Sequence, residues 1–194
     1  MRLKVDRDLA GALYEFSRDS GLPVVHVNYG TASGHLSTMC MDWGTFIPLW
    51  FVHREYLAHD KQMPPIVVVT PSREVSWGSL VDFGAKISEA VERLNKVAVF
   101  IASADQAHAH DPNGPYGFDD AASEYDERVV EIVKSGDLEG LLSFDASFID
   151  RAKPDSLWQM LILAGVVKKE GLRFKEYTYG RPTYFGMLYA AFTK

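Results

Sequence analysis

Three short runs along the chain are almost wholly apolar and rich in β-branched residues: Leu22–Val27, Ile66–Thr70 and Val97–Ala104. Uninterrupted apolar runs of this length, bounded by turn residues, are typical of strands in a sheet that is covered on both faces. A helical pattern lies in each of the two connections between these runs. We therefore expect the three strands to lie in one sheet with parallel crossovers.

Helical spacing of apolar residues occurs between and after these runs. Asp6 is expected to cap a helix in which Leu9, Leu13 and Phe16 lie on one face and which ends at Gly21. The same reasoning predicts further helices, in chain order, at Thr45–Tyr56, Trp77–Leu94, Ala121–Lys134, Leu138–Phe144 and Asp155–Val166.

The end of the chain returns to a strand pattern. Arg173–Tyr179 and Tyr184–Phe192 are predicted to pair as two strands joined across Gly180, Arg181 and Pro182. No internal repeat, low-complexity tract or linker divides the chain. The predicted fold class is α/β, with residues 1–194 forming a single domain. Its central sheet, mostly parallel or mixed, would have helices on both faces.

Composition narrows the class of protein. The formal net charge is −6 and no run is rich in Lys or Arg, which argues against nucleic acid as a partner. Cys40 is the only cysteine, so the chain can form neither an internal disulfide nor a thiolate zinc cluster. No segment has the pattern of a secretory signal or the length of a membrane helix. A cytoplasmic location without membrane contact is expected.

The densest group of polar side chains follows the run Val97–Ala104. In an open α/β sheet this position, beyond the carboxyl end of a strand, is where active sites lie. His108 and His110 are two residues apart and would share a side in extended backbone, and Asp105 could fix an imidazole tautomer. From residue types alone, a catalytic loop and an ordinary solvated loop remain equally open.

The segments around this loop resemble a known family. Ala102–His108, followed by His110–Pro112 and Gly114–Gly117, resembles the central motif of class III extradiol ring-cleavage dioxygenases. The closest branches are the protocatechuate 4,5-dioxygenase beta-subunit, homoprotocatechuate-type enzymes and the Memo-like superfamily. Three other segments match this family's motifs in order and spacing, so that the resemblance covers its C-terminal two-thirds: Asp42–Leu49, Asp155–Leu161 and Pro182–Met187.

The resemblance implies chemistry at a non-haem Fe(II) held by two histidines and a carboxylate, with an aromatic diol and O₂ as substrates. By motif, His108 matches the family's acid/base histidine and Asp105 would orient it, while Asp155 stands near the carboxylate ligand. A change at His110, which the loop allows to face solvent, is expected to cost less than one at His108. The residues expected to line the substrate pocket are His110, Gly44, Thr45, Pro48, Tyr116 and Tyr184.

The match departs from the family at the metal ligands. The family's two ligand histidines come from strand ends upstream of the part that this chain matches, and neither His26 nor His35 fits their motif. The expectation is a domain that lacks the N-terminal metal-binding segment. Two functions follow: a dioxygenase that is complete only as a homo- or hetero-oligomer or with an upstream segment, and a non-catalytic, Memo-like partner subunit or binding protein.

Overall fold

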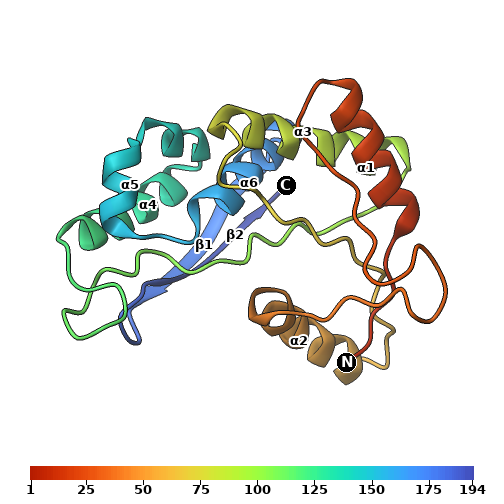
Figure 1. Cartoon of the computed structure of the whole chain (residues 1–194), viewed down its shortest axis with the longest axis horizontal. Helices are drawn as coiled ribbons and strands as arrows, with labels where there is room; N and C mark the ends of the chain where they lie inside the picture. Colours follow the sequence, from red (N-terminus) through yellow and green to blue (C-terminus); the bar gives the residue numbers. More distant parts are fainter. The chain divides into compact units, whose positions relative to one another are not determined.

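The computed structural model describes all 194 residues as two compact units (Figure 1). The first unit comprises Met1–Thr70 and Ala90–Val97, and the second comprises Pro71–Glu89 and Ala98–Lys194. The chain contains six α-helices, one 3₁₀ helix and one two-stranded antiparallel sheet. The predicted mixture of helix and strand is therefore present.

Helix α1 (Arg7–Asp19) of the first unit confirms the sequence prediction. The Asp6 carboxylate accepts a hydrogen bond from the Leu9 backbone N–H at 3.0 Å, and it also forms an ion pair with Lys96 at 2.7 Å. Both contacts lower the pKa of Asp6, Lys96 more than Leu9. Because a charged cap interacts favourably with the N-terminal end of the helix dipole, Asp6 fixes where α1 begins.

Helix α2 (Trp43–Ala58) begins two residues before the predicted start. The Asp42 carboxylate caps it by accepting the Thr45 N–H at 2.8 Å. Although its sequence is largely apolar, none of its residues is buried, and Trp43 is 78% exposed. Neither α2 nor any other helix is both long enough and apolar enough to cross a bilayer.

The predicted central sheet is not confirmed. None of the segments Leu22–Val27, Ile66–Thr70 and Val97–Ala104 forms a strand, and no two of them pair with each other. Ile66 forms an isolated parallel bridge with Val5, which lies outside these segments. Val97 is fully exposed and Val99 is 86% exposed. An apolar pattern predicts that a segment favours burial, but it does not specify the neighbour with which its backbone pairs.

The second unit holds most of the buried core. It contains α4 (Ala121–Ser135), the 3₁₀ helix η1 (Leu138–Ser143), α5 (Ala146–Ala152) and α6 (Leu157–Glu170), together with the first part of α3 (Trp77–Arg93). Helix α4 contacts α5 and η1, and η1 contacts α6. Their side chains include the largest fully buried groups of the chain: Tyr125, Leu138, Leu141, Leu157 and Leu161.

Helices α3 and α6 approach each other through glycine. A Cβ atom on Gly84 would collide with the backbone oxygen of Ile162, and one on Gly165 would collide with the backbone oxygen of Val81. The two backbones are therefore in van der Waals contact, with no space for a side chain at either position. This close approach fixes the distance between the two helices.

The last two strands pair as the sequence predicts, although the second begins at Met187, three residues after its predicted start. β1 (Arg173–Gly180) and β2 (Met187–Thr193) pair antiparallel from Arg173–Thr193 to Gly180–Met187, with an irregularity between Phe174 and Glu176. Helix α4 contacts β1. Gly186, in the segment that connects the two strands, forms backbone hydrogen bonds with the loop at residues 105–111. The connecting segment therefore lies beside this loop.

Candidate active site

The loop that carries His108 is anchored by backbone hydrogen bonds. The N–H groups of His108 and Ala109 both donate to the Ala152 carbonyl, at 3.1 and 3.4 Å, at the C-terminal end of α5. At the start of the loop, the buried Gln106 side chain accepts a hydrogen bond from the Ser156 hydroxyl at 2.9 Å. Ser156 in turn accepts from the Tyr125 hydroxyl at 2.9 Å. Both ends of the short segment before His108 are therefore fixed to buried groups.

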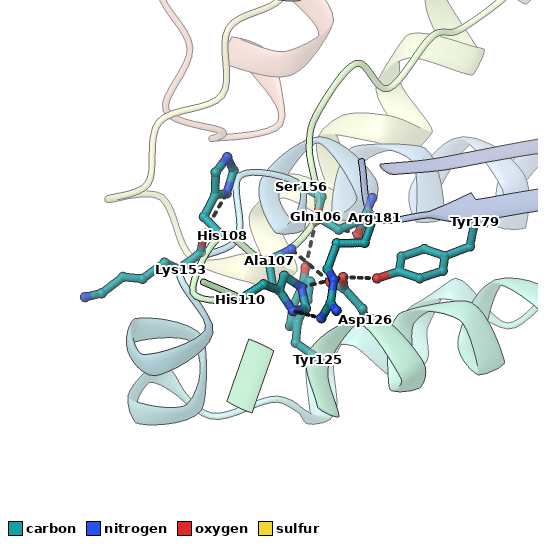
Figure 2. A network of polar contacts seen from close by, with 10 residues as sticks. All are labelled: Gln106, Ala107, His108, His110, Tyr125, Asp126, Lys153, Ser156, Tyr179 and Arg181. Atoms are coloured by element: carbon teal, nitrogen blue, oxygen red, sulfur yellow. Dashed lines mark hydrogen bonds and ion pairs between the residues drawn. The ribbon is translucent and has the colours of Figure 1, made fainter. Parts of the chain in front are cut away.

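The two nitrogens of the His108 imidazole have different neighbours. Nδ1 lies 2.9 Å from the Lys153 carbonyl oxygen (Figure 2). A carbonyl oxygen only accepts, so Nδ1 carries the hydrogen and Nε2 is the basic atom of the neutral ring. Nε2 lies 3.7 Å from a carboxylate oxygen of Asp105, longer than a hydrogen bond but close enough for a strong charge effect.

The surroundings of His108 favour its protonated form. The Asp105 carboxylate raises the pKa of His108 most, and the Lys153 carbonyl and the charge of Asp155 raise it further, while partial burial opposes them. Asp105 therefore lies where its charge stabilises the imidazolium, while the Lys153 carbonyl holds the ring at Nδ1. The orienting role expected of Asp105 remains a prediction. A raised pKa places the loss and gain of the His108 proton in a pH range above that of an ordinary histidine.

Asp105→Asn is expected to lower the pKa of His108, because the substitution removes the carboxylate that contributes most to the shift. Asp155→Asn, which removes a weaker and more distant charge, should lower it less. The measurement is an NMR titration of the His108 ring signals in each variant. An unchanged pKa in Asp105→Asn would contradict the assigned role of that carboxylate.

The same pKa shift has a consequence for stability. Because the folded-state pKa of His108 is raised, its contribution to stability is fully present below the unfolded-state pKa and is lost as pH rises through the folded-state pKa. The unfolding free energy of Asp105→Asn should accordingly show less of this decline than that of the wild type over the same pH range.

Three aromatic rings surround the His108 imidazole. The ring centroids of Tyr116, Phe185 and Tyr184 lie 5.1, 5.6 and 5.8 Å from that of His108. Tyr116 and Tyr184 were predicted to line the substrate pocket, and the structure brings both to His108. Phe185 was not singled out, although it lies within the matched segment Pro182–Met187. An aromatic wall of this kind suits contact with a planar aromatic ligand.

His110 differs from expectation. It was expected to share a side with His108 and to face solvent, but the two side chains point in different directions and His110 is only 8% exposed (Figure 2). Its Nε2 donates to the Asp126 carboxylate at 2.9 Å, and Arg181 donates to its Nδ1 at 3.2 Å. The sequence reasoning assumed extended backbone, whereas a turn precedes His110. Its predicted place in the substrate pocket remains a prediction.

Asp155 lies close to the His108 loop but is tied to another group. Its backbone N–H donates to the Asp105 and Gln106 carbonyls at 3.3 and 3.4 Å, and its carboxylate forms an ion pair with Arg73. The Arg73 guanidinium also lies 4.2 Å from the ring centroid of Trp158. The ion pair uses one of the two carboxylate oxygens of Asp155, and its role as a metal ligand remains a prediction.

The residues do not fit the Fe(II) site that the resemblance implies. Such a site requires two imidazoles and a carboxylate around one point. No group of three or more His, Cys, Asp or Glu side chains in the chain is arranged to hold a metal ion. Both ring nitrogens of His110 are already hydrogen bonded.

The remaining predicted pocket residues lie in the first unit. Gly44, Thr45 and Pro48 are all in the first half of α2. Their place in a substrate pocket remains a prediction. Asp126 and Lys153, in contrast, contact the His108 loop and were not predicted from the sequence.

Comparison with known proteins gives two findings. The family described as "Catalytic LigB subunit of aromatic ring-opening dioxygenase" matches residues 1–191. The chain is also 30% identical over 175 residues to a curated relative, "Protein CA_C1420" of Clostridium acetobutylicum. That similarity covers 90% of this chain and 36% of the relative, so the chain spans about a third of the relative's length.

Proposed function

Because the chain belongs to the family of catalytic LigB subunits of aromatic ring-opening dioxygenases, we propose that it acts in extradiol cleavage of a catechol-type ring by O₂. The observation that carries this proposal is the His108 site. It combines an imidazole whose Nε2 is available for proton exchange, a carboxylate beside that nitrogen and a wall of aromatic rings.

In this proposal His108 moves protons between its Nε2 and the diol. The neutral imidazole takes a proton from a catechol hydroxyl, and the imidazolium that forms is stabilised by Asp105 and by the Lys153 carbonyl. The same nitrogen then returns a proton as the ring-opened product forms. Tyr116, Tyr184 and Phe185 would hold the diol ring near the imidazole.

If Fe(II) were held with the help of ligands from outside this chain, it would supply the chemistry that binds the diol and activates O₂. Since the described residues do not form a three-donor group, we propose that a partner subunit in a homo- or hetero-oligomer contributes ligands. Small aromatic diols and O₂ are the proposed substrates, and the proposed location is the cytoplasm.

The isolated chain is expected to retain much less than one equivalent of Fe(II) after anaerobic loading and desalting, because fewer than three donors form a weak site. Elemental analysis of the desalted protein measures this ratio. Stoichiometric iron would show that His26, His35 or another donor completes the site, and it would remove the need for a partner's ligands.

The direct test of the function is catechol-dependent oxygen uptake by the folded protein with Fe(II) and any copurifying partner subunit. Because both oxygen atoms enter the ring-opened product, one O₂ should be consumed for each diol. The absence of uptake by folded, iron-supplied protein in the presence of its partner would contradict the proposal.

A second function, a non-catalytic Memo-like partner subunit or binding protein, is favoured by the contacts of the candidate ligand Asp155 and of His110. His110 uses both ring nitrogens within the chain, and Asp155 is paired with Arg73. In this case a catechol should shift the NMR signals of the His108 ring without any oxygen uptake. The two measurements together separate the two functions.

A further inference from the structure

We propose that Asp126 is a positioning residue for His108: a buried carboxylate that holds both the backbone before His108 and the segment carrying two of the rings beside it. This inference rests on the proposed function for its catalytic meaning, but the geometry it describes is independent of turnover. Asp126 lies on α4 and is 2% exposed.

The Asp126 carboxylate accepts three hydrogen bonds, two from the His108 loop and one from β1 (Figure 2). One oxygen accepts the Ala107 backbone N–H at 2.9 Å, directly before His108 in the chain. The other accepts His110 Nε2–H at 2.9 Å and the Tyr179 hydroxyl at 2.5 Å. A buried carboxylate with these donors is strongly held, because the buried N–H groups of Ala107 and His110 would be left unsatisfied without it.

Tyr179 keeps its proton for this contact. Burial, followed by the hydrogen bond to Asp126, raises the pKa of the Tyr179 phenol well above its ordinary value. At neutral pH the hydroxyl is therefore a donor, and Asp126 remains the acceptor. The arrangement joins α4, β1 and the His108 loop through one side chain.

Asp126 also restricts the position of the backbone segment that carries Tyr184 and Phe185. Gly186 accepts the Gln106 N–H at 2.9 Å and donates to the Ala107 carbonyl at 3.0 Å, so the two segments lie side by side. A Cβ atom on Gly186 would collide with the Asp126 carboxylate. The rings of Tyr184 and Phe185 therefore reach His108 from a backbone that rests on Asp126.

Asp126 acts on His108 only through these neighbours. The polar atoms near the His108 ring belong to Lys153 and Asp105, and Asp126 is not among them. Asp126→Asn retains the shape of the side chain but exchanges one acceptor oxygen for an NH₂ donor. At least one of the three hydrogen bonds is then lost, although no group beside the His108 ring is removed.

The experiment compares wild type, Asp126→Asn and the control Asp82→Asn by NMR in the full chain. Asp82 is an exposed carboxylate on α3 in the same unit. In Asp126→Asn the His108 ring signals should shift, and the Ala107 amide should exchange at least about tenfold faster. Amides of α6, such as those of Leu161 and Ile162, should change less than about twofold, and Asp82→Asn should leave all these values near wild type.

Two results would overturn the inference: unmoved His108 ring signals, or a uniform rise in exchange through α6, which indicates general loss of stability. If Asp126→Asn does not fold, Tyr179→Phe takes its place, since it removes one donor from the same carboxylate. That variant should shift the His108 ring signals to a smaller extent, and unchanged signals would again overturn the inference.

Turnover adds a separate readout. Where oxygen uptake is measurable, Asp126→Asn should lower kcat about tenfold or more with little change in KM, because a displaced acid/base group slows chemistry more than binding. Failure of the proposed function would show as no uptake in any variant while the NMR shifts persist. Failure of the positioning role would show as normal uptake and unmoved signals in Asp126→Asn.

Discussion

His108→Gln is expected to lower kcat for catechol-dependent oxygen uptake by about 10²–10⁴-fold, the usual cost of removing a general acid/base. Glutamine approximates the size of histidine and can still donate an N–H to the Lys153 carbonyl, which is 2.9 Å from His108 Nδ1. Its amide cannot exchange a proton at neutral pH. The fold should therefore persist while the proton transfer at Nε2 is lost. Oxygen uptake with Fe(II) and any partner subunit measures the effect.

The matched control for this substitution is His59→Gln. His59 is also hydrogen bonded through Nδ1 to a backbone carbonyl, that of Glu55 at 2.8 Å, but it is exposed at the end of α2. Its replacement should leave the rate unchanged. Equal rates in wild type and His108→Gln would end the acid/base assignment. His110→Gln is a poor control, because His110 is buried against Asp126 and its loss would disturb the fold.

Gly84→Ala is expected to destabilise the second unit by about 3 kcal/mol, at the upper end of the cost of overpacking. The new methyl group would collide with the Ile162 backbone oxygen and would also lie against Gly165. A side chain could rotate away, but two helix backbones can separate only by moving whole elements. Urea denaturation followed by circular dichroism measures the change in unfolding free energy.

Gly78→Ala, on the same helix, is the matched control. Gly78 is exposed and no atom lies within 4 Å of the position that its Cβ would take. Because alanine has the higher helix propensity, the substitution should be neutral or stabilising by up to about 1 kcal/mol. If Gly84→Ala and Gly78→Ala changed stability alike, the close approach of α3 and α6 would not be present in solution.

The helices were largely predictable because their determinants are local. Asp6 and the apolar spacing after it predicted α1, and the patterns at residues 77–94 and 121–134 predicted α3 and α4 to within one residue at their ends. Helix α5 was not predicted, because seven residues are too few for a periodic pattern. The apolar runs at residues 22–27, 66–70 and 97–104 gave no strand, since a strand depends on a partner distant in sequence.

The candidate site was predictable where side-chain identity carries the chemistry. His108, Tyr116 and Tyr184 came from motifs, and the structure brings them together. The Lys153 contact could not be predicted, because it uses a backbone carbonyl. Asp126 did leave a signal: it shares the buried face of α4 with Ala122, Tyr125 and Val129, where an acidic residue requires buried donors.

The segment Val97–Ile101 has a consequence for the solution behaviour of the chain. It is an uncharged, β-branched stretch with exposed Val97, Val99 and Ile101, and none of its residues belongs to a strand. Stretches of this composition recruit equivalent segments from other molecules and seed aggregates. Lys96, directly before the stretch, is the kind of charged flanking residue that opposes such stacking. Association between copies of this stretch would then set the highest concentration at which the purified chain stays in solution without aggregating.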